Sequence, residues 1–98
     1  MKRSLFENIV SRVADVYRIG SDIIFDRDAG TQAKRARQMV WWLSNDRQIE
    51  LFEISEYTEK YGLKMSKSTV LHGIKSFQKR MDSDDDILKI VNQIKIQL

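Results

Sequence analysis

The sequence predicts an all-α fold, a small helical bundle that forms a single domain over residues 1–98. Apolar residues recur along most of the chain at the spacing of three and four that places side chains on one side of a helix. No segment shows the alternation of a convincing strand. Proline is absent, and three of the four glycines lie between the helical segments. A chain of this length can bury one modest core.

The first helix is expected to begin after Ser4, whose hydroxyl can cap it while Glu7 reaches back to the cap. Its apolar stripe consists of Phe6, Ile9, Val10, Val13, Val16 and Tyr17. Gly20 suits the left-handed residue that ends a helix. Ser21 can then cap a short turn that carries Ile23, Ile24 and Phe25 into the core. A loop over 26–30 follows.

A second long helix is predicted from about Gln32 to Asn45. Its inner side consists of Ala36, Met39, Val40 and Leu43, and its outer side of Lys34, Arg37, Gln38, Trp41 and Asn45. Trp41 can stack on a sugar-phosphate edge or pack against a neighbouring helix, and packing is preferred because large aromatic residues are seldom left exposed. Trp42 is expected to border the core.

A third helix is predicted near 52–61, with Ile54, Tyr57 and Tyr61 inside, an acidic outer face and an end at Gly62. The fourth is expected to start after Ser66. Its apolar arc consists of Val70, Ile74, Phe77 and Met81, and the opposite side of Ser68, His72, Lys75 and Lys79. Acids at 84–86 mark the start of a last helix, because they complement the positive end of its dipole. The stripe of that helix consists of Ile87, Leu88, Val91, Ile94 and Leu98.

Charge is sorted along the chain, although the formal net charge is only +3. Residues 32–45 carry +3 and residues 60–81 carry +6 with no acid, whereas 46–59 carry −4 and 82–98 carry −2. A cationic stretch without acids indicates an anionic partner.

Other classes of function fit poorly. The chain has no cysteine and one histidine, so it offers no disulfide, no thiolate metal site and no nucleophile and base at a readable spacing. We expect no enzyme, no cofactor, no metal and no small-molecule substrate. No apolar run is long enough to span a bilayer, and the residues after Met1 lack the apolar stretch of a signal peptide, so a cytoplasmic protein without a membrane partner is expected.

The third and fourth helices, separated by the short segment 62–65, form a candidate helix-turn-helix. In such a motif the N-terminal residues of the second helix lie at base edges in the major groove of DNA. Ser66, Lys67 and Ser68 have side chains that can donate to bases. Further along lie Thr69, His72, Lys75 and Lys79, where phosphates flank the groove.

Two blocks of sequence resemble the C-terminal DNA-binding domain, domain IV, of the bacterial replication initiator DnaA. Residues 33–43, Ala-Lys-Arg-Ala-Arg-Gln-Met-Val-Trp-Trp-Leu, are similar to the family's basic loop and helix, A-R-P-R-Q-x-A-M-Y-L. Residues 66–73, Ser-Lys-Ser-Thr-Val-Leu-His-Gly, are similar to its signature D-H-T-T-V-L-H-A. The resemblance covers roughly residues 6–94. It implies a Trp-repressor-like helical fold and binding of double-stranded DNA by a recognition helix at about 67–81 and a basic loop and helix at about 27–41.

The resemblance also implies roles for individual residues. Ser66, Lys67 and Ser68 take the positions that contact bases, and Thr69 and His72 those that contact the backbone. Arg37 and Gln38 match a pair that touches phosphates, Lys34 and Arg35 lie in the same basic block, and Arg27 lies in the loop. Ala29 stands where the family has the arginine of the minor groove, Ser66 and Lys67 replace Asp and His, and the segment between the two helices is longer. These departures indicate a site other than the usual DnaA box.

The chain has no glycine-rich phosphate loop and no room for an ATPase domain, so a stand-alone regulator is expected. It is expected to control replication, at an origin-like site, or transcription by occupying DNA, and to be encoded on a phage or another mobile element. Two alternatives stay open. One is a protein-interaction module that binds a host replication protein through the acidic residues of 46–59. The other is a dimeric regulator of Trp-repressor type with half-sites about one helical turn apart.

Overall fold

The computed structural model describes all 98 residues and contains six helices and no strand. They are α1 (Lys2–Tyr17), α2 (Ser21–Ile24), α3 (Thr31–Asp46), α4 (Leu51–Lys60), α5 (Lys67–Asp82) and α6 (Asp85–Gln97). The predicted all-α bundle is confirmed. No helix is both long enough and apolar enough to cross a membrane.

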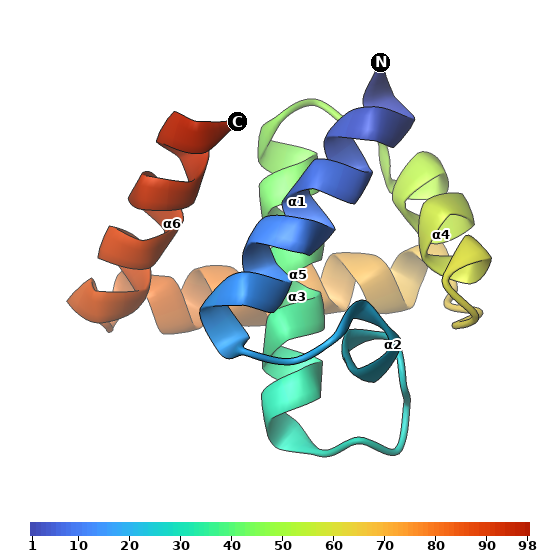
Figure 1. The fold of residues 1–98 in the computed structure, drawn as a ribbon, viewed down its shortest axis with the longest axis horizontal. Helices are drawn as coiled ribbons and strands as arrows, with labels where there is room; N and C mark the ends of the chain where they lie inside the picture. Colours follow the sequence, from blue (N-terminus) through green and yellow to red (C-terminus); the bar gives the residue numbers. More distant parts are fainter.

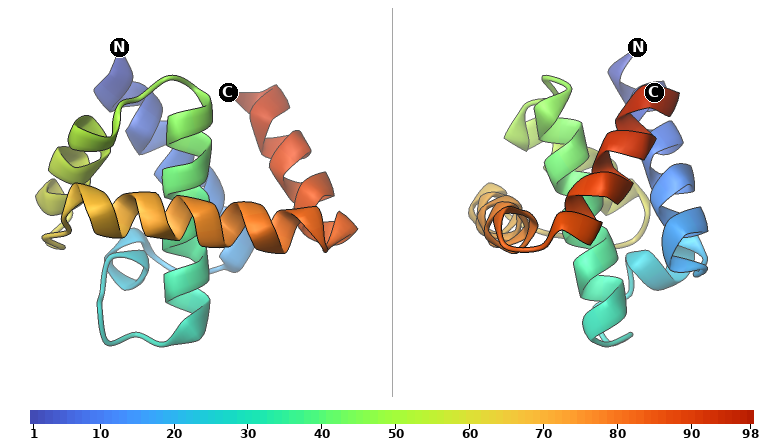
Figure 2. Two further views of the ribbon diagram at one scale, coloured as in Figure 1. Left: turned by 180° about the vertical axis from the view of Figure 1, so that it is seen from behind. Right: turned by 90° about the vertical axis from the view of Figure 1, so that its left-hand side faces the viewer.

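The helix α3 lies at the centre of the molecule (Figure 1). α1 packs on one side of it and α5 on the other, and α5 crosses α3 at a steep angle (Figure 2). α4 and α6 lie at opposite ends of α5 (Figure 1). Because α3 is covered from two sides, its residues meet neighbours on most of its circumference.

One continuous core of twenty buried residues joins the helices. An aromatic group lies at the end of the core next to α4, where Phe6 contacts Tyr57 and Tyr61, with ring centroids 5.4 and 6.1 Å away. Phe25 stacks on Tyr61 at 4.6 Å. Burial raises the pKa of Tyr61, and the nearby carboxylate of Glu7 adds to the rise. α1, α2 and α4 are therefore held together by aromatic packing.

α5 forms as the sequence predicts. Ser66 caps its N-terminus, because the Oγ of Ser66 accepts a hydrogen bond of 3.2 Å from the backbone N–H of Thr69. The predicted arc, Val70, Ile74, Phe77 and Met81, is buried. The start of α6 is also confirmed, with Asp84 accepting from the N–H of Asp86. Gly62 ends α4 with a φ of +100°, a conformation that glycine adopts without strain.

The ends of α1 differ from the prediction. The helix begins at Lys2, so Ser4 and Glu7 are inside it and form no capping box. The Nζ of Lys2 forms an ion pair of 3.0 Å with Glu53 of α4, a long-range contact that sequence spacing does not show. At the other end Arg18, not Gly20, adopts the left-handed conformation. Gly20 is extended and itself takes the cap position of α2, which was expected of Ser21.

Several apolar residues were assigned to the core but lie outside it. Val16, Ile23 and Leu88 are exposed. Tyr17, Tyr57 and Tyr61 are only partly buried, because each lies at the edge of a helix-helix contact. Helical spacing identifies the side of a helix that packs, but the neighbouring helices decide how wide the covered strip is.

The outer side predicted for α3 is also wrong at three positions. Arg37, Gln38 and Trp41 are buried, whereas Lys34 and Asn45 are exposed as expected. The reason is that α5 covers Gln38 and Trp41, while the end of α2 and the loop after it cover Arg37. The preference for packing of Trp41 is confirmed, and Trp42 borders the core with its Nε1 donating to Gln78 at 2.8 Å.

Candidate nucleic-acid interface

The outward side of α5 is polar and free of carboxylates over most of its length. Ser68, His72, Lys75 and Lys79 are all exposed, as the sequence predicts. Lys67 is also exposed, in the first turn of the helix. α5 therefore presents hydroxyl, imidazole and ammonium groups to solvent while its other side is fixed in the core.

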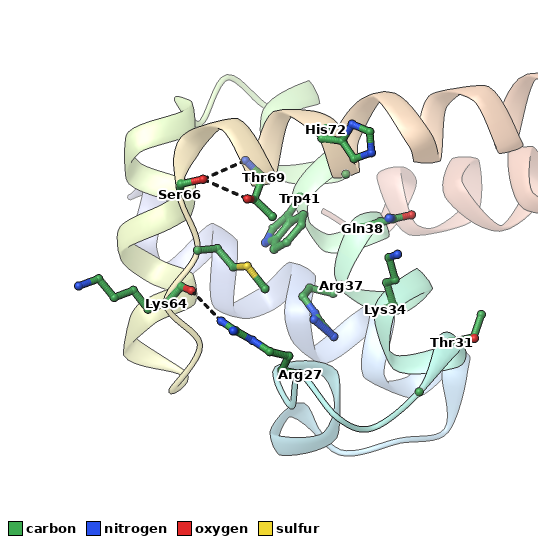
Figure 3. Close-up of a pocket in the computed structure, with 13 residues that line it drawn as sticks. Arg27, Thr31, Lys34, Arg37, Gln38, Trp41, Lys64, Ser66, Thr69 and His72 are labelled. Carbon is green, nitrogen blue, oxygen red and sulfur yellow. Dashed lines mark hydrogen bonds between the residues drawn. The ribbon is translucent and has the colours of Figure 1, made fainter.

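A hollow of about 680 Å³ adjoins the start of α5, and we call it the first groove (Figure 3). It lies between the loop that precedes α3, the N-terminal half of α3 and the N-terminal half of α5. Three cationic side chains line it, namely those of Arg27, Lys34 and Arg37, and no carboxylate does. Lys64 lines it with its backbone, while its side chain points away (Figure 3). Its other polar lining residues are Thr31, Gln38, Ser66, Thr69 and His72. Such a lining attracts anions.

Arg37 forms a fixed part of the wall of the groove. Its Nε donates to the carbonyl oxygen of Ile24 at 3.0 Å and its Nη2 to that of Asp26 at 3.3 Å. Only 5% of the residue is exposed. Burial lowers the pKa of Arg37, and the charge of Arg27 lowers it further, but a guanidinium stays protonated in proteins. The site thus holds a permanent positive charge whose position is set by the backbone.

Arg27 connects the two sides of the groove. Its Nη2 lies 3.4 Å from the carbonyl oxygen of Lys64, so the loop before α3 contacts the segment between α4 and α5 (Figure 3). Ser55 of α4 donates to the carbonyl oxygen of Met65 and fixes the same segment from its other side. The turn of the predicted helix-turn-helix is therefore held by side chains of two other elements.

The contact between α3 and α5 is very close where the helices cross. Trp41 is buried, and its Nε1 donates to the Oγ1 of Thr58 on α4 at 3.1 Å. Its ring lies against Gly73 of α5, where a Cβ atom would be 2.7 Å from two ring carbons. Gln38 is beside this contact, and its Oε1 accepts from Arg80 at 3.0 Å. Trp41, Gly73 and Gln38 thus determine the distance between α3 and α5 where the two helices cross.

The first groove brings together seven of the twelve residues predicted for the site. These are Arg27, Lys34, Arg37, Gln38, Ser66, Thr69 and His72. The other five, Arg35, Lys67, Ser68, Lys75 and Lys79, are exposed outside it. Lys64 is the cation that the prediction missed. It belongs to the acid-free stretch 60–81, and that charge pattern is the signal that identifies it.

No carboxylate lines this groove, although Asp26, next to Arg37, partly offsets its charge. The two salt bridges of the structure join Lys2 to Glu53 at 3.0 Å and Lys95 to Asp46 at 3.2 Å. Neither includes a cation of the first groove. Arg27, Lys34 and Arg37 form no salt bridge within the protein, so an external anion can still pair with them.

The chain matches no known protein-family model, no curated protein and no solved structure. No group of three or more histidine, aspartate or glutamate side chains is placed to bind a metal ion. The feature of the molecule that bears on its function is therefore the first groove, which lies beside the exposed side of α5.

Proposed function

We propose that this protein binds double-stranded DNA and regulates replication or transcription in the cytoplasm by occupying its site, without catalysing a reaction. α5 lies in the major groove, with Lys67 and Ser68 at base edges. The first groove holds the sugar-phosphate backbone that flanks the N-terminal end of α5. The observation that supports this most directly is a groove lined by three cationic side chains and no carboxylate, beside an exposed polar helix.

The chemistry of α5 suits this role. Lys67 and Ser68 are exposed in the first turn, where side chains of a recognition helix reach bases. The Ser66 oxygen caps the helix and lies 3.0 Å from the Thr69 hydroxyl. When Thr69 donates in that pair, the Ser66 hydroxyl hydrogen can donate to DNA. Lys75 points to solvent further along, where phosphates lie. Bases and backbone are thus contacted by different residues.

The first groove supplies a phosphate site that is already formed. The Arg37 guanidinium is held by two carbonyl oxygens and needs no reordering to meet an anion. Lys34 adds a flexible ammonium group beside it, whereas Lys64 meets the groove with its backbone and its side chain points away (Figure 3). Fixed donors reduce the entropy lost on binding, so this groove favours the backbone at one defined position.

The proposal is tested by selecting bound duplexes from a random pool. The protein is then titrated with the selected duplex and with a scrambled duplex at several salt concentrations. We expect log K to fall linearly with log salt with a slope of roughly −4 to −7, for about 5–8 phosphate contacts at −0.9 each. No binding at low salt, or no selected sequence, would contradict it.

Variants separate the two kinds of contact. Lys67→Ala and Ser68→Ala should reduce the preference for the selected duplex over the scrambled one, because each removes a base contact. Lys34→Ala and Lys75→Ala should weaken binding to both duplexes by the same factor and make the slope less negative by about 1. Lys89→Ala, an exposed and unpaired cation of α6, is the control and should change neither quantity.

A further inference from the structure

A second hollow, of about 430 Å³, lies between the N-terminal half of α3 and the C-terminal half of α5, and we call it the second groove. All its lining residues are polar or charged. Four are cations, namely Lys34, Arg35, Lys79 and Arg80, and none is a carboxylate. The resemblance to DnaA identifies the N-terminal end of α5 as the reading end, and it assigns no role to Arg80.

Arg80 is held in place without an acidic partner. Its guanidinium carbon lies 5.2 Å from the centre of the Phe77 ring, and its Nη2 donates to Gln38 at 3.0 Å. Ser83 donates to the carbonyl oxygens of Lys79 and Arg80, so the last carbonyl groups of α5 are partly satisfied at the groove. Burial raises the pKa of the Tyr17 hydroxyl, and the charge of nearby Arg80 opposes that rise. A guanidinium has five N–H groups, so Arg80 can bond to Gln38 and still donate to a phosphate.

The helix dipole explains only part of this cluster. Lys79 and Arg80 are in the last turn of α5, where cations are favoured. Lys34 and Arg35 come from α3, close to its N-terminus, where the dipole disfavours cations. That first turn contains no acidic residue. Four cations from the ends of two helices repel one another, and an external anion would relieve the repulsion.

The two grooves adjoin each other along the N-terminal half of α3, because they share Thr31, Lys34 and Gln38 in their linings. α5 has 16 residues and is therefore about 24 Å long. The major groove is about 12 Å wide. When the N-terminal turn of α5 lies at base edges, its last turns extend beyond the bases to a sugar-phosphate edge.

We propose that the second groove binds the backbone at the opposite edge of the major groove from the first groove. This inference rests on the proposed function. Arg35, Lys79 and Arg80 contact the phosphates of that edge, with Ser76 and Ser83 as hydroxyl donors at its rim. The protein thus contacts both strands that border the major groove, and α3 lies between the two contacts.

The test compares a double variant of the second groove, Arg35→Ala with Lys79→Ala, with a matched control, Arg3→Ala with Lys60→Ala. Both pairs consist of exposed cations from two helices with no salt bridge, but the control pair lies in a hollow that also contains Glu7. Neither pair makes a side-chain hydrogen bond in the protein, so both variants should fold, which circular dichroism will show. Each protein is titrated with the selected duplex over a range of salt, and its contacts are mapped by ethylation interference.

We expect the Arg35 and Lys79 variant to make the slope of log K against log salt less negative by about 1.8, for two lost phosphate contacts. Interference should disappear at one cluster of phosphates and persist at the first groove, and the control should match the wild type. A slope and interference pattern equal to those of the wild type would overturn the inference, as would an equal change in the control. Both of these outcomes require that the wild-type protein binds DNA. A wild-type protein that does not bind the duplex would instead contradict the proposed function.

Discussion

α3 and α5 are both sixteen residues long and cross at the centre of the molecule, but they meet their surroundings differently. α5 buries five residues, all of them apolar or glycine, and turns a polar side to solvent. α3 buries nine, and these include Arg37, Gln38 and Ser44. α5 is packed on one side only, whereas α3 is packed between α1 and α5.

The difference shows what a central helix contributes to a binding site. Polar side chains on α3 form hydrogen bonds with other elements. Arg37 donates to the end of α2 and to the loop after it, and Gln38 accepts from Arg80. They are therefore fixed before any ligand arrives. The exposed lysines of α5 are free to adapt. We expect the fixed donors of α3 to determine where the sugar-phosphate backbone of the DNA lies. We expect the mobile side chains of α5 to adjust to the bases and so to read the DNA sequence.

The largest expected effect in this comparison comes from the two adjacent tryptophans of α3. Trp41→Ala should lower the free energy of unfolding by about 3–5 kcal/mol, because it removes a fully packed indole and its hydrogen bond to Thr58. Trp42→Ala is the matched control and should cost clearly less, since Trp42 is only partly buried. Urea denaturation measures both. Equal losses would mean that Trp41 is no more a part of the core than Trp42, which also contacts α5.

Much of α5 could be predicted from the sequence, because a helix packed on one side has a periodic pattern. Val70, Ile74, Phe77 and Met81 repeat at helical spacing, and all are buried. The cap at Ser66 could be predicted for a local reason, since its hydroxyl reaches an N–H three residues away. The exposed candidates on α5 followed directly from the same pattern.

The interior of α3 could not be predicted in this way. The apolar spacing of α3 predicts that Arg37 and Trp41 face solvent. The sequence of one helix does not show which other elements cover its polar side. Their partners, Ile24, Asp26 and Thr58, are at least 11 residues away along the chain. The first groove was likewise predicted only as a charge pattern. Which cations face one another is decided by the crossing of α3 and α5.

The next largest expected change in stability comes from Gly73, where α5 crosses α3. Gly73→Ala should lower the free energy of unfolding by about 1–3 kcal/mol, because the new methyl group would lie 2.7 Å from the Trp41 ring. In an ordinary helix the same change stabilises by up to about 1 kcal/mol, so the expected sign is reversed. Ser76→Ala, in the same helix, is the control and should change stability by less than about 0.5 kcal/mol.

A double-mutant cycle shows whether the tryptophan is the cause. In a Trp41→Leu background the smaller side chain leaves room for the methyl group, so Gly73→Ala should become neutral or stabilising. The coupling between the two positions should then be favourable and on the order of 1 kcal/mol or more. An alanine at position 73 that costs the same in both backgrounds would show that the crossing is not set by this contact.

The smallest expected change in stability is at Ser66, at the start of α5. Two variants of this residue separate its role in capping the helix from its role in binding DNA. Ser66→Ala should cost about 1 kcal/mol of stability, since the N–H of Thr69 loses its acceptor. Ser66→Gly should cost only a few tenths, because glycine is tolerated at this cap position. Neither variant has a hydroxyl. If Ser66 contacts DNA, both should therefore lose the same factor in affinity for the selected duplex despite their different stabilities. An affinity that follows stability instead would assign Ser66 to the cap alone and leave Lys67 and Ser68 as the residues that read bases.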